Sequence, residues 1–230
     1  GLVATAISFA ILPTLSSQYS VSSNQYSVDA ANTEYRTLNT EHFQSTLAFG
    51  IKLVLLLILP ATVGLFILAR PIVALLFEHG AFTPSDTTAT ATALQFYLIG
   101  LPFAAIDQPL VFAFYARKNT LLPNLVQFFA VAIYLVVALS LVQPFGMIGL
   151  VVANSAMLTG HALIMLWLTR TRLGGFGQSE MMATTAKIIV AAVVMGGVVF
   201  IVQGLLDSIV LQVGVSAIVG LRSVVQTVRR

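Results

Sequence analysis

Apolar stretches alternate with short polar ones along most of this chain. A helix needs about 20 residues to cross a bilayer. Five of the apolar stretches are long enough, namely residues 45–69, 87–115, 121–142, 147–168 and 183–206. Two further apolar stretches, 1–16 and 209–221, are short for a span. The polar stretch 17–44 has apolar side chains at roughly helical spacing in its second half, which predicts a surface helix leading into the membrane.

The composition strengthens this interpretation. Of the 230 residues, 58% are hydrophobic and only 8% are charged, whereas soluble domains carry about 25% charged residues. We therefore predict an all-α fold, a polytopic transmembrane helix bundle. We divide it into residues 1–206, which include a polar cytoplasmic loop at 17–44, and residues 207–230, a short final helix with a basic cytoplasmic tail. Because the apolar stretch begins at the first residue, without Met or a basic leader, we expect a piece of a longer protein.

Basic residues are scattered at the ends of the predicted spans and do not form a patch that would indicate nucleic-acid binding. If the spans simply alternate in direction, one side of the membrane receives most of them: Arg36, Arg117, Lys118, Arg170, Arg172, Arg222, Arg229 and Arg230. The other side receives only Arg70. The positive-inside rule makes the richer side cytoplasmic.

A polar corner lies between the first two complete spans. We expect a helix to end at His79, Gly80 to take a positive φ, and Thr83 to start the next helix in a capping box with Asp86. Glu78 and His79 are adjacent, so they point to different sides of a helix, and the other histidines lie in other segments. We therefore interpret Glu78, His79 and Gly80 as a structural corner on the external side and expect no metal there.

Two charged residues lie inside apolar runs, Lys52 and Asp107. Ionisable groups at that depth usually face a bundle interior or a watery cavity, so both are candidates for contacting a substrate or each other. The alternative for Lys52 is that its long side chain reaches back to the membrane surface. Two prolines, Pro102 and Pro109, flank Asp107 and predict a bend in that helix.

Arg170, Arg172 and Lys187 form a predicted basic edge on the cytoplasmic side. This edge fits anionic lipid headgroups, or it serves only to set the topology. The chain has no cysteine, and no Ser/His/Asp set, phosphate loop or zinc motif can be placed. We therefore expect neither an enzyme nor a cofactor.

Five stretches of the chain resemble the MurJ/MviN family of lipid II flippases, in the multidrug/oligosaccharidyl-lipid/polysaccharide exporter superfamily. They are a helix ending in an "LPxLS" turn at 1–16, a helix proline at 58–60, a "PIxxLFERGxF" corner at 71–82, an "FYAxxDTxTP" turn at 114–123 and a "GxxGL" helix entry at 146–150. His79 replaces the usual arginine of the corner, Asn119 the aspartate of the turn, and Leu122 its threonine.

The resemblance implies the C-terminal lobe of a two-lobed transporter in the bacterial cytoplasmic (inner) membrane. Such a protein moves the undecaprenyl-pyrophosphate-linked peptidoglycan precursor, lipid II, by alternating access. Its implied partners are that lipid, membrane lipids and the N-terminal lobe of the same protein. Lys52 and Asp107 are cavity candidates from their position and match no family motif. The alternatives are an exporter of another lipid-linked polysaccharide or a cationic drug, and a non-transporting membrane scaffold or fragment.

Overall fold

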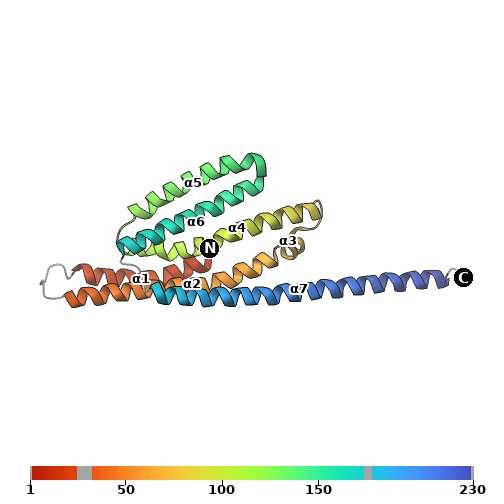
Figure 1. Cartoon of the computed structure of the whole chain (residues 1–230), viewed down its shortest axis with the longest axis horizontal. Coiled ribbons are helices and arrows are strands. Elements are labelled where there is room, and N and C mark those ends of the chain that lie inside the picture. The colour runs from red at the N-terminus through yellow and green to blue at the C-terminus, as the bar shows by residue number, and fades with distance from the viewer. Residues whose placement is uncertain (1, 25–32, 174–177, 229–230) are drawn as a thin grey trace.

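Helices are the only regular secondary structure in the described part of the chain, residues 2–24, 33–173 and 178–228, in the computed structural model (Figure 1). They are α1 (Leu2–Asn24), α2 (Thr33–Ile67), α3 (Ala69–Phe77), α4 (Pro84–Ala116), α5 (Leu121–Phe145), α6 (Met147–Arg172) and α7 (Gln178–Val228). Five contain a segment long and apolar enough to cross a membrane, namely α2, α4, α5, α6 and α7. The predicted all-helical fold and the five complete spans are confirmed.

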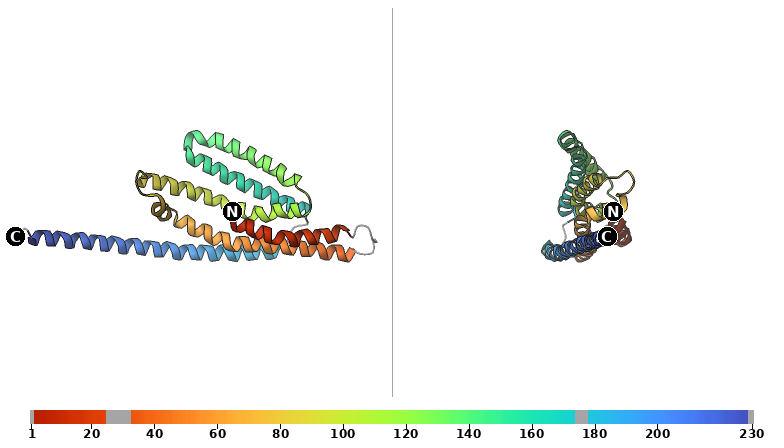
Figure 2. Two further views of the ribbon diagram at one scale, coloured as in Figure 1. Left: turned by 180° about the vertical axis from the view of Figure 1, so that it is seen from behind. Right: turned by 90° about the vertical axis from the view of Figure 1, so that its right-hand side faces the viewer.

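The helices lie in a row with α4 near its centre. On one side α4 packs against α6, which packs against α5. On the other side it packs against α1 and α2, and α7 lies against α2 at the edge of the row (Figures 1 and 2). Helices α1, α2 and α4 all contact one another and form a three-helix group, whereas α5 and α6 extend the other side as a hairpin.

Successive long helices alternate in direction, as the charge pattern predicted. The α4–α5 turn and the C-terminal end of α6 lie together at one end of the bundle, here called the basic end because it carries Arg117, Lys118, Arg170 and Arg172 (Figure 1). The α3 corner and the α5–α6 turn lie at the other end, here called the corner end. The largest buried apolar cluster joins α1, α2, α4 and α6 near the basic end and includes Leu15, Leu47, Ile51, Leu110 and Met165.

Apolar side chains also cover the outer surfaces of the row. On α5 the exposed residues include Phe128, Phe129, Val136 and Leu139, and on α7 they include Val190, Val193, Val194 and Phe200. A soluble monomer rarely exposes apolar patches on this scale. In a membrane these side chains contact lipid acyl chains, which are as apolar as the side chains themselves. Their exposure is therefore what a membrane protein requires.

The helix boundaries differ from the sequence predictions in several places. Helix α1 continues to Asn24, beyond the predicted apolar stretch 1–16, whereas the start of α2 at Thr33 agrees with the surface helix predicted in the second half of 17–44. Helix α5 continues beyond the predicted span 121–142, through Pro144 to Phe145, and Gly146 alone reverses the chain.

The largest difference concerns the C-terminal part. We expected a separate short helix from about residue 207, whereas α7 is one helix from Gln178 to Val228. No proline lies after Pro144, and Asp207 and Ser208 have only modest costs in a helix, so nothing in the sequence forces a break. The far end of α7 projects past the corner end of the row (Figure 1). The division at 206 and the cytoplasmic position of residues 207–230 stay predictions.

The corner forms largely as its sequence predicts. Gly80 has φ +65°, and α4 starts in a complete capping box. The Thr83 N–H donates to Asp86 Oδ2 at 2.9 Å, and the Asp86 N–H donates to Thr83 Oγ1 at 3.4 Å. The preceding helix ends at Phe77, two residues before the predicted position, and Glu78 is its C-cap.

We expect Thr83→Ala to destabilise the protein by about 1 kcal/mol, because the substitution removes the side-chain acceptor of the capping box. The measurement is thermal unfolding of the purified protein in detergent. Thr83→Ser, which keeps the hydroxyl, should behave like the wild type. Thr90→Ala, further along α4, is the matched control, and a loss as large there would contradict the capping role.

Candidate functional site

The interface between α4 and α6 carries a line of polar contacts. Near the corner end, Ser155 Oγ donates to the carbonyl oxygen of Phe96 at 2.8 Å. Near the basic end, Arg117 Nη1 lies 3.5 Å from the carbonyl oxygen of Arg172. Two contacts along this interface join residues that are 55 positions apart in sequence: Gly100 with Ser155, and Arg117 with Arg172. Because the separation is the same at both, the two helices run parallel in fixed register.

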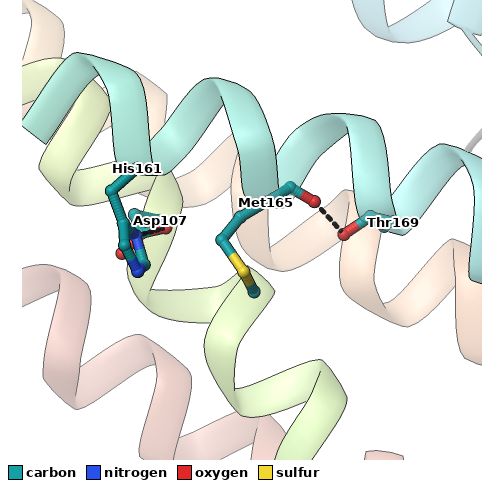
Figure 3. Close-up of polar contacts among 4 residues, drawn as sticks. All are labelled: Asp107, His161, Met165 and Thr169. Carbon is teal, nitrogen blue, oxygen red and sulfur yellow. Dashed lines mark hydrogen bonds and ion pairs between the residues drawn. The ribbon is translucent and has the colours of Figure 1, made fainter. Parts of the chain in front are cut away.

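Asp107 and His161 meet in the middle of this interface. His161 Nδ1 lies 2.8 Å from Asp107 Oδ1, and Figure 3 shows the two side chains reaching toward each other from α6 and α4. The two groups form an ion pair when the imidazole is protonated. His161 Nε2 is buried and meets no hydrogen-bond partner among the described residues.

The sequence identified only half of this pair. Asp107 was a predicted interior residue, whereas His161 was considered only as a possible third metal ligand and set aside because it lies in another segment. One signal could have found it. Asp107 and His161 each precede the basic end of their own helix by about ten residues, and parallel helices that leave the membrane on the same side bring such positions to the same depth.

Lys52 lies on a different face of α2 from the residues that contact α4. The packing stripe includes Leu47, Ile51, Val54 and Ile58, and one further residue along a helix turns about 100° away. Lys52 instead lines an open groove of about 650 Å³ with Glu41, Gln44, Ser45, Thr46, Ala48 and Phe49. Asp107 lies 2.8 Å from His161 across the α4–α6 interface, and an approach of Lys52 to Asp107 stays a prediction.

Three helices are tied together at the basic end. The Arg117 guanidinium lies 4.8 Å from the centre of the Phe43 ring, a distance at which a cation is attracted to an aromatic face. Gln44 Nε2 donates to the carbonyl oxygen of Leu173 at 2.9 Å. With the contact between Arg117 and Arg172, these bonds connect the start of α2 to the ends of α4 and α6.

The predicted basic edge is exposed. Arg170 and Arg172 lie in the last turn of α6, and Lys187 is exposed on α7. Residues 174–177 between them lie outside the described part of the chain.

At the corner, Glu78 contacts the following helix. Glu78 Oε2 accepts a hydrogen bond of 2.7 Å from Thr87 Oγ1, which ties the end of α3 to the first turns of α4. His79 and Gly80 are exposed. Within residues 2–24, 33–173 and 178–228, no group of three or more His, Cys, Asp or Glu side chains is arranged to hold a metal ion.

Comparison with known proteins gives consistent matches. A probable lipid II flippase MurJ of Bdellovibrio bacteriovorus is 29% identical over 190 residues, covering 83% of this chain and 33% of the relative. The corresponding protein of Vibrio cholerae is 32% identical over 155 residues, covering 67% of this chain and 26% of the relative. That of Rickettsia prowazekii is 39% identical over 106 residues, covering 46% and 21%. The chain thus spans about a third or less of the length of these relatives.

The fold agrees with these matches. A solved structure, lipid II flippase MurJ in an inward closed conformation, superposes with a TM-score of 0.53 at 23% identity, covering 85% of this chain and 46% of that one. These likenesses to bacterial proteins and the five helices that could cross a membrane identify a multi-pass protein of the bacterial cytoplasmic membrane. The family model described as "Lipid II flippase MurJ" matches residues 1–217, and the chain therefore belongs to the lipid II flippase MurJ family.

Proposed function

We propose that this chain forms the C-terminal lobe of a transporter that moves lipid II across the cytoplasmic membrane by alternating access. The observation that carries the proposal is the match of the family model over residues 1–217. Its partners are the lipid-linked precursor, membrane lipids and an N-terminal lobe of the same protein. Translocation breaks no covalent bond, so the function needs neither a nucleophile nor a cofactor, and the protein is not an enzyme.

The charge distribution fits an anionic substrate. A pyrophosphate headgroup that leaves water loses hydration, and a positive side chain within reach compensates part of that cost. Lys52 lines a groove near the basic end and supplies such a charge. Arg170, Arg172 and Lys187, exposed at the basic end, contact the headgroups of anionic membrane lipids.

The packing fits a lobe that moves as one body. Transporters built from two bundles alternate access largely by rocking one bundle against the other. The ties among α2, α4 and α6 at the basic end, and the buried cluster beneath them, keep these helices together during such a motion.

The test is complementation by the full coding sequence that contains this chain. In a bacterium whose own lipid II flippase is depleted, the gene should restore growth. Liposomes containing the purified full-length protein should translocate labelled lipid II. Transport only of another lipid-linked polysaccharide or of a cationic dye would replace lipid II as the substrate. Binding without any transport would indicate a scaffold and contradict the proposal.

We expect Lys52→Ala in the full-length protein to lower the lipid II translocation rate roughly tenfold or more, because a hydrogen bond to a charged group is worth about 1.5–3 kcal/mol. Lys52→Arg, which keeps the charge, should retain most of the rate. Lys118→Ala removes an exposed charge outside the groove and is the control. A normal rate for Lys52→Ala would rule out the groove as part of the substrate path.

A further inference from the structure

We propose that α3 lies in the plane of the membrane surface and docks there against phospholipids, with Arg70 at their phosphate groups. Helix α3 has nine residues, Ala69–Phe77, whereas a helix that crosses a bilayer needs about 20. The candidate span Glu41–Ile67 ends directly before it, and the next candidate span begins at Pro84. Its place in the chain is therefore a membrane boundary. The proposal does not depend on what the protein transports.

The sequence explains why the chain leaves the direction of α2 before α3. Pro71 has no N–H to donate to the carbonyl oxygen of Ile67, four residues earlier, and its ring crowds that oxygen. The two helices are separated at Leu68, and Gln95 Nε2 of α4 donates a 3.0 Å hydrogen bond to the carbonyl oxygen of Phe66 beside the break. Figure 1 and the left view of Figure 2 show α3 as a compact coil seen nearly end-on, while α2 and α4 run across the views. Helix α3 therefore lies across the direction of the spans, as a helix in the membrane surface does.

Contacts with α4 fix the side of α3 that faces the protein. Ala69 and Val73, one turn apart, form a buried cluster with Ala91 of α4. Just beyond the helix, Glu78 accepts the 2.7 Å hydrogen bond from Thr87 of α4. Because α3 is held to α4 in this way, its opposite face has a fixed orientation toward its surroundings.

The opposite face of α3 is apolar and exposed. Leu75 lies about 200° around the helix from the buried Val73, and it is 82% exposed. Leu76 and Phe77 are each more than half exposed. The last turn of α2, which belongs to a candidate membrane span, exposes Phe66 as well. The apolar face of α3 thus continues the surface with which α2 meets lipid.

Arg70 supplies the polar side of an interfacial helix. It is exposed in the first turn of α3 and is the only charged side chain of that helix. A guanidinium group can form two parallel hydrogen bonds with phosphate oxygens, and a positive charge is attracted to the anionic lipids of a membrane surface. A basic residue on one side with Leu and Phe on another is typical of helices whose apolar face lies at the boundary between headgroups and acyl chains.

Lipid fits this face better than a protein partner or water does. A specific protein interface takes about 20–30 residues from each side, whereas α3 exposes five: Arg70, Pro71, Leu75, Leu76 and Phe77. In water, three successive large apolar side chains would stay hydrated at a cost in free energy. Phospholipid offers both acyl chains and phosphate groups, which match the two kinds of side chain that α3 exposes.

The experiment measures the depth of α3 in lipid nanodiscs with a nitroxide spin label on the full-length protein. Residues 1–230 contain no cysteine, so Leu75→Cys carries the only label once any cysteine elsewhere in the full-length protein is replaced. Collisions with oxygen, which concentrates in lipid, are compared with collisions with a water-soluble nickel chelate. We expect the ratio of oxygen to nickel collisions to be several-fold higher for Leu75→Cys than for His79→Cys, and lower than for Val136→Cys in the span of α5.

Three other results would each overturn the proposal. A ratio for Leu75→Cys equal to that for His79→Cys would place α3 in water, and one as high as that for Val136→Cys would place it deep in the bilayer. Few collisions with both reagents would show that the rest of the protein, or a second copy, covers this face. Leu76→Cys, at the neighbouring exposed position, gives the same measurement if the first variant fails to fold.

Arg70 is tested through phospholipid binding. We expect Arg70→Gln to weaken the binding of phosphatidylglycerol to the full-length protein about fivefold, the contribution of one basic residue at an anionic surface, as measured by native mass spectrometry. Arg70→Lys, which keeps the charge, should retain most of the affinity. His79→Gln, which changes an exposed residue of the same corner, should bind like the wild type. Equal binding by Arg70→Gln and the wild type would overturn the assignment of Arg70 to a lipid phosphate.

Discussion

Replacing Gly149 by alanine is expected to disrupt the α5–α6 hairpin and leave little folded protein. A Cβ atom at this position would overlap the carbonyl oxygen of Leu141 and lie 2.6 Å from its carbonyl carbon. These are backbone atoms of the neighbouring helix, so no side-chain rotation relieves the overlap. Gly149 is also buried. Overpacking a well-packed interface costs roughly 1–3 kcal/mol and sometimes more, and contact with backbone places this substitution at the upper end.

The measurement is the yield and unfolding temperature of the purified variant, compared with Gly197→Ala in α7. A Cβ at Gly197 would meet nothing within 4 Å. Alanine is better than glycine inside a helix by roughly 0.5–1 kcal/mol, so this control should be as stable as the wild type or slightly more stable. Equal stability of Gly149→Ala and Gly197→Ala would show that α5 and α6 are not packed this closely.

The same stretch shows what the sequence could and could not predict. Its resemblance to a "GxxGL" helix entry identified the two glycines but not their separate reasons. Gly146 reverses the chain with φ +56° and ψ −127°, a conformation that residues with a Cβ rarely adopt. Position 149 requires glycine because the backbone of α5 lies close to it. That closeness depends on tertiary packing, so the local sequence pattern does not predict it.

Local sequence patterns were enough to predict the corner and the membrane spans. The Thr83 capping box involves residues three positions apart, and Gly80 needs only its own backbone angle, so both were predicted correctly. The continuation of α7 beyond Leu206 was not predicted, because a polar pair after an apolar run resembles a helix end although it contains no residue that stops a helix.

The candidate site depended on tertiary contacts and was only half predicted. Asp107 was predicted as a site residue because it lies inside an apolar run, where a carboxylate is costly and usually functional. Its partner was assigned to another segment because residues 54 positions apart share no local pattern. The register of two parallel helices brings them together, and that register follows from the way Gly100 and Ser155 allow α4 and α6 to approach.

Gly100→Ala is accordingly expected to weaken the α4–α6 interface along its whole length. The added Cβ would lie 2.9 Å from Ser155 Cα and 3.1 Å from Ser155 Oγ. Small residues let membrane helices pack closely and satisfy each other's polar groups, so the methyl group should lengthen both the Ser155–Phe96 hydrogen bond and the Asp107–His161 contact two turns away. We expect a loss of about 1–3 kcal/mol in stability, measured by thermal unfolding in nanodiscs.

A second substitution separates crowding of the backbone from crowding of the side chain. Ser155→Gly removes Cβ and Oγ but leaves the Cα atom that is closest to position 100. Gly100→Ala/Ser155→Gly should therefore recover only part of the lost stability. Gly204→Ala, in an open position of α7, is the control and should be as stable as the wild type or slightly more stable. Full recovery in the double variant would place the conflict in the serine side chain, and a Gly100→Ala protein as stable as Gly204→Ala would show that α4 and α6 are not packed this closely.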